Sequence, residues 1–162
     1  MSRQLVELEN VLRLLIDEHR KLLVEVEKHR TAIKAMNVAG MDESRVRQEA
    51  LRLKITVLEK RRAGVTSQLA AGHKMQSVTL TQLAELNPQF SAKLLALRDE
   101  LRSVIGQISG HTQVAGKVAG AVLGHLNTVV RLLTGAMRQA GVYTKRGLPQ
   151  AAPRIGVMDA VG

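Results

Sequence analysis

The chain has 162 residues, of which 24 are Lys or Arg and 14 are Asp or Glu, so its formal charge at neutral pH is +10. This length suits one domain. The absence of Cys excludes disulfides, thiol catalysis and Cys-ligated zinc. One Phe and one Tyr are too few for an RNA-binding surface built on stacked rings, and the long regular runs of Leu and Val disfavour an all-β fold.

The first predicted helix covers residues 3–37. Apolar residues or histidines recur there at alternating steps of three and four, the spacing of a coiled-coil heptad. This seam comprises Leu5, Leu8, Leu12, Leu15, His19, Leu22, Val26, His29, Ile33 and Met36. Glu9 and Arg13, four residues apart, form an acid-before-base pair that favours an exposed opposite face. We expect Gly40 to lie near the C-cap of this helix and Asp42 to cap the next one.

The second predicted helix covers residues 43–71, and Gly72 is expected to end it. Its seam comprises Leu51, Ile55, Leu58, Arg62, Val65 and Leu69. Because Arg62 is a long cation on an apolar line, we expect it to extend toward solvent or to pair with a carboxylate of the first helix. Thr79 and Gln82 then have the spacing of a capping box, which predicts a short helix over 79–86. Pro88 ends that helix by disfavouring helical geometry at Asn87.

The last predicted helix, over residues 89–140, is the longest. Its seam line comprises Leu94, Leu97, Leu101, Val104, Ile108, His111, Ala115, Val118, Val122, His125, Val129, Leu132 and Ala136. These patterns predict an all-α fold: an elongated antiparallel three-helix coiled-coil bundle with a short extra helix, forming one domain over residues 1–141. The long helix exceeds its neighbours, so its C-terminal end is expected to project. Residues 142–162 lack apolar periodicity and predict a flexible, disordered tail.

A second apolar line runs beside the seam line near the end of the long helix. It comprises Leu123, Leu126, Val130, Leu133 and Met137. Together the two lines make about half of the helix circumference apolar, which is wider than one neighbouring helix requires. The surplus is either buried by the first two helices or by self-association, or kept for a partner helix. Under the last hypothesis the partner would cover Val122, Leu123, Leu126, Val129, Val130, Leu133 and Met137.

Five glycines lie in the middle of the same helix: Gly106, Gly110, Gly116, Gly120 and Gly124. Each costs about 1 kcal/mol of helix stability relative to alanine. We therefore expect this part of the helix to be intrinsically weak and able to bend or fray.

Catalytic motifs are missing. The sequence has no P-loop, no GxSxG and no Cys nucleophile, so we expect no enzymatic activity, no cofactor and no small-molecule substrate. The histidines of the seams lack metal-ligand spacing and are interpreted as polar residues that set helix register, not as a metal site. Residues 103–130 contain only one charge, Lys117, but too many polar side chains for a membrane span. No apolar leader segment begins the sequence, which indicates a cytoplasmic protein.

The positive charge is concentrated in the second half of the chain. From Leu101 to Met158 there are seven basic residues and no acid: Arg102, Lys117, Arg131, Arg138, Lys145, Arg146 and Arg154. Such a segment attracts anions, which leaves open a basic helical protein that binds nucleic acid. A structural coiled-coil homo-oligomer is the other alternative, because self-association would also bury the wide apolar face.

The order of these features resembles the FlgN family of flagellar type III export chaperones over nearly the whole chain. The matching features are a Leu-rich first helix, the opening of the short helix, a long last helix and a Tyr-x-x-x-Gly at the start of the tail. They include Leu58, Glu59, Arg62, Leu69, Gly72, Thr79, Leu80, Leu83, Leu97, Leu101, Asn127, Leu133, Tyr143 and Gly147. The net charge of +10 and the glycine run are departures from what the family requires.

The resemblance implies a cytosolic chaperone that binds a disordered, helix-forming terminal segment of hook–filament junction proteins of the FlgK and FlgL type. It further implies delivery of these proteins to the export gate protein FlhA, with a tyrosine near the C-terminal end used in docking. Tyr143 is the only Tyr in the chain, so that role would fall on it. Under this interpretation nucleic acid is not the expected partner, and the protein contacts the membrane only indirectly, through the export apparatus.

Overall fold

The computed structural model describes the backbone of residues 2–140 and the side chains of residues 3–135. The chain divides into two compact units, Met1–Ala119 and Gly120–Gly162. Four helices follow one another: α1 (Ser2–Lys34), α2 (Val38–Gly72), α3 (Leu80–Leu86) and α4 (Pro88–Ala140). The predicted all-α helical bundle is confirmed for the described residues. Each unit is described by itself below.

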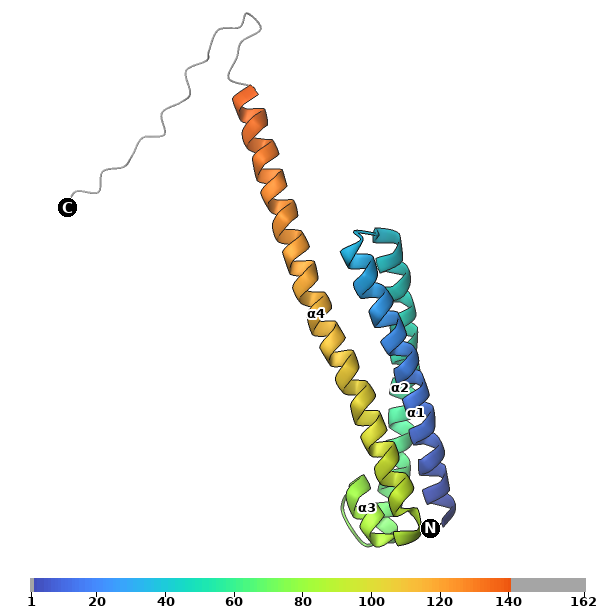
Figure 1. Cartoon of the computed structure of the whole chain (residues 1–162). Helices are drawn as coiled ribbons and strands as arrows, with labels where there is room; N and C mark the ends of the chain where they lie inside the picture. The colour runs from blue at the N-terminus through green and yellow to red at the C-terminus, as the bar shows by residue number, and fades with distance from the viewer. Residues whose placement is uncertain (1, 141–162) are drawn as a thin grey trace, which may run out of the picture. The chain divides into compact units, whose positions relative to one another are not determined.

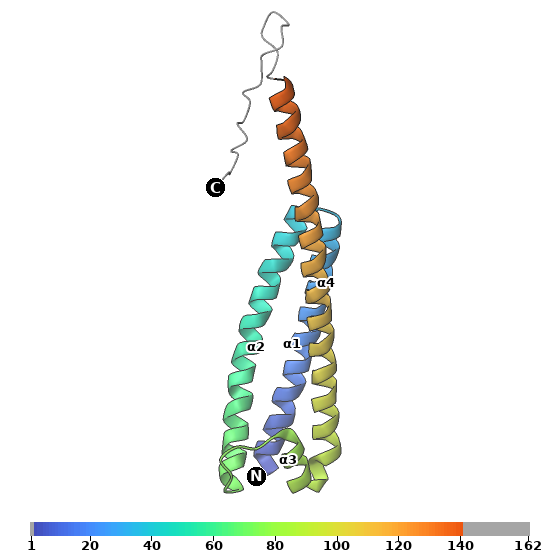
Figure 2. The ribbon, with the colours of Figure 1, turned by 90° about the vertical axis from the view of Figure 1, so that its left-hand side faces the viewer.

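In the first unit, α1 and α2 run antiparallel and α4 begins beside the N-terminal end of α1 (Figures 1 and 2). The short helix α3 lies at this same end. One hydrophobic core joins all four helices, with buried residues Leu5, Leu8, Val11, Leu12, Leu15 and Ile16 from α1, Val65 and Leu69 from α2, Leu83 and Ala84 from α3, and Leu94, Leu97 and Leu101 from α4. The seam residues predicted at this end of α1 and α4 are therefore core residues.

The first connection differs from its prediction. Helix α1 ends at Lys34 because Met36 adopts a left-handed backbone with φ 52°, and the Asn37 N–H reaches the Ala32 carbonyl at 2.9 Å. This hydrogen bond is characteristic of a Schellman motif, in which the residue with the left-handed backbone is usually glycine. Met36, predicted as the last seam residue, is consequently 58% exposed.

Helix α2 accordingly begins earlier than expected. Its N-cap is Asn37, whose side-chain oxygen accepts a hydrogen bond from the Gly40 N–H at 3.0 Å. The prediction that Gly40 lies near the C-cap of the first helix and that Asp42 caps the second was wrong, since both lie inside α2. Asparagine is as good an N-cap as aspartate, and it is the first residue after the Schellman turn.

The remaining boundaries follow from local chemistry. Thr79 is the N-cap of α3: its hydroxyl accepts from the Gln82 N–H at 3.2 Å, and its own N–H donates to Gln82 Oε1 at 2.9 Å. The predicted capping box is confirmed. Asn87 separates α3 from α4, as expected for the residue before Pro88.

Ion pairs cross between the helices of the first unit at its surface. Arg61 of α2 donates to Glu7 of α1 at 2.9 Å, and Arg20 of α1 pairs with Glu100 of α4. Arg62, by contrast, pairs with Glu59 of its own helix at 2.8 Å rather than with α1. Such exposed pairs contribute at most about 1 kcal/mol each. The buried leucines therefore dominate the stability of this unit.

Candidate functional site

The predicted binding face lies in the second unit, on the last described turns of α4. Leu123, Leu126, Val129, Val130 and Leu133 are all exposed, and Val122 is half-buried. The side chain of Met137 lies outside the described residues, as does the whole of Tyr143. The six described members of the predicted set thus form an apolar helix surface in contact with water.

One residue of this surface was absent from the predicted set. Leu132 is 69% exposed, the largest fraction among the long apolar side chains of this stretch. Leu132 was predicted on the seam line together with Val122 and Val129, but only those two were included in the predicted set. The signal that could have identified it is the three-residue step from Val129, because this step places Leu132 at the edge of the apolar arc opposite Leu123.

The two threonines of the same stretch hydrogen-bond to their own helix. The Thr128 hydroxyl donates to the Gly124 carbonyl at 3.0 Å, and the Thr134 hydroxyl donates to the Val130 carbonyl at 2.8 Å. Arg131 is exposed and lies about 180° from Val122 at 100° per residue. The exposed His125 of the seam line interrupts the apolar arc, and the nearest described Lys or Arg, Arg131, lies on the opposite side of the helix.

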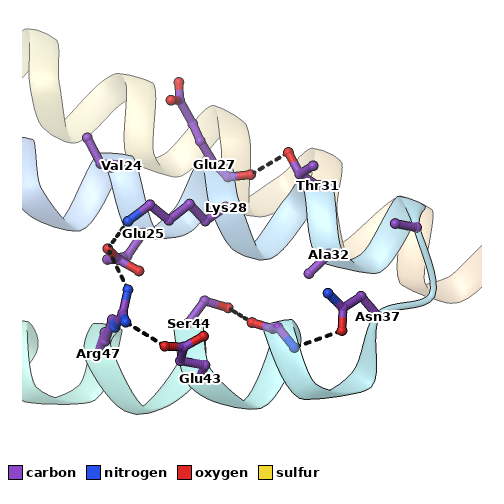
Figure 3. A pocket seen from close by; sticks show the side chains of 12 residues that line it. Val24, Glu25, Glu27, Lys28, Thr31, Ala32, Asn37, Glu43, Ser44 and Arg47 are labelled. Atoms are coloured by element: carbon purple, nitrogen blue, oxygen red, sulfur yellow. Dashed lines mark hydrogen bonds and ion pairs between the residues drawn. The ribbon is translucent and has the colours of Figure 1, made fainter.

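A different surface feature lies between α1 and α2 near their connection (Figure 3). It is an open pocket of ≈ 430 Å³. Glu25 pairs there with Lys28 at 2.7 Å and with Arg47 at 3.9 Å, and the Ser44 hydroxyl donates to the Gly40 carbonyl at 2.8 Å. The contact of Glu25 with Arg47 connects α1 to α2, and the contact of Ser44 with Gly40 connects α2 to its own first turn. These contacts indicate a structural role for the polar residues that make them.

Three histidines of the first unit, His19, His29 and His111, have side-chain partners, whereas the ring Nε2 of His73 is buried without one. His19 donates from Nδ1 to the Leu15 carbonyl at 2.7 Å, His29 Nδ1 lies 2.8 Å from the Ser44 hydroxyl, and His111 Nε2 lies 3.5 Å from Glu27. Within the part of the chain that the structure describes, no three His, Asp or Glu side chains converge as metal ligands. The contacts of His19, His29 and His111 fit a role in positioning the helices against one another.

Helix α4 also contains a stretch, Pro88–Gly135, that is long and apolar enough to cross a membrane by length and composition. Its mean hydropathy reaches 1.2 in the most apolar window. Length and composition alone are weak evidence for a span, because core helices of other proteins meet the same condition. Lys117, Gln113 and Asn127 within this stretch would each cost free energy in hydrocarbon.

Exposed apolar helix faces are surfaces on which amphipathic helices of other chains can pack. The sequence model described as FlgN protein matches residues 1–151. The chain therefore belongs to the FlgN family, which is a family of flagellar export chaperones. Comparison with curated proteins finds no match, and comparison with solved structures finds none either.

Proposed function

We propose that the chain is a cytoplasmic export chaperone for hook–filament junction proteins of the FlgK and FlgL type. It binds a disordered, helix-forming terminal segment of these proteins on the face of α4 formed by Val122, Leu123, Leu126, Val129, Val130, Leu133 and Met137. It then delivers them to the export gate protein FlhA, with Tyr143 as the docking residue. No catalytic step is part of this function.

The exposed apolar face of α4 is the observation that carries the proposal. Burying one large aliphatic side chain contributes about 1.5–3 kcal/mol, so the six described residues could contribute on the order of 10 kcal/mol gross. Folding the bound segment offsets several kcal/mol of this gain. The net affinity is then strong enough to protect a substrate and weak enough for release at the gate.

A pair of substitutions on opposite sides of α4 tests this proposal. Leu133→Asp places a carboxylate in the apolar face, removing about 2 kcal/mol of burial and adding the cost of desolvating a charge. We expect binding to a purified junction protein to weaken by about a hundredfold or more. Since Leu133 is 59% exposed, the variant should keep the circular dichroism of the parent.

Arg131→Asp is the matched control, because Arg131 neighbours Leu133 in sequence but points away from the apolar arc. It changes the charge by two, whereas Leu133→Asp changes it by one. An apolar site predicts that Arg131→Asp leaves affinity nearly unchanged. A site for nucleic acid or another polyanion predicts that Arg131→Asp is the more damaging variant, and that order of effects would refute the proposal.

A further inference from the structure

We draw no further inference here: the strongest candidate, the exposed apolar face of α4 in the second unit, belongs to the site already described, and nothing in the structure shows what covers it.

Discussion

The glycines of α4 provide a direct test of how this helix is stabilised. A Cβ atom added at Gly106 or Gly110 would meet no atom within 4 Å, so packing does not require glycine at either position. Alanine is more stable than glycine in a helix interior by about 1 kcal/mol. We expect Gly106→Ala/Gly110→Ala to raise the free energy of unfolding by about 1–2 kcal/mol and Tm by about 3 °C per kcal/mol.

The assay is urea unfolding followed by circular dichroism, with an unchanged m value as evidence that the same surface is exposed. Gly40→Ala is the matched control, because its Cβ would lie 2.9 Å from Nδ2 of Asn37, the side chain that caps α2. We expect no stabilisation there, since loss of the cap offsets the helix gain. The reasoning would be refuted if Gly40→Ala raised the free energy of unfolding as much as Gly106→Ala/Gly110→Ala did. It would also be refuted if Gly106→Ala/Gly110→Ala lowered the free energy of unfolding.

Three further predictions concern the core, the surface and the docking residue. Leu12→Ala should lower the free energy of unfolding by about 2–5 kcal/mol in the same urea assay, because Leu12 is fully buried; a loss below 1 kcal/mol would contradict the described core. The hydrogen bond to Glu18 raises the pKa of Lys21 above its usual 10.5. Any stabilisation from the Lys21–Glu18 pair is therefore present at neutral pH and lost only as pH rises through the raised pKa of Lys21. A ¹⁵N NMR titration of Lys21 Nζ, with Lys21→Gln as the control, should show a pKa above 10.5. A pKa at or below 10.5 would contradict the prediction. Tyr143→Ala should keep the affinity for the junction protein but reduce its secretion in a motility-competent strain; loss of that affinity would contradict the division of roles.

Most of the fold follows from heptad periodicity. Leu5, Leu8 and Leu12 were predicted as seam residues and are buried, because a three-four apolar line has no other stable place than a helix interface. The capping box of Thr79 was equally readable, since both of its side chains lie in one tetrapeptide. These elements depend on short-range sequence signals that act in the same direction as the tertiary packing.

The first connection was mispredicted because its decisive conformation has no sequence signal. A left-handed residue at the end of a helix is usually glycine, whereas the chain uses Met36 there and places Gly40 inside α2. Of the two expectations for Arg62, pairing with a carboxylate of α1 was wrong, because Arg62 pairs with Glu59 three residues earlier in α2, with its side chain partly exposed. Periodicity does not distinguish between these nearby partners.

The candidate site is a different case. The two apolar lines were visible in the sequence, but whether the surplus face was buried by the chain's own helices could not be decided from spacing. Leu123 and Leu132 are exposed within the second unit, and this exposure motivates the proposal of a partner. The role of Tyr143 rests on the family alone, since this residue lies outside the described range.

The most direct test of the account is the identity and salt resistance of the chains that this protein binds in its own cells. Tagged protein would be purified with nuclease at low and at high salt, and associated chains would be identified by mass spectrometry. An apolar chaperone face predicts that a FlgK- or FlgL-type junction protein is retained at high salt by the parent and by Arg131→Asp, and is lost from Leu133→Asp. Retention only of nucleic acid or ribosomal proteins, removed by raising the salt, would contradict it.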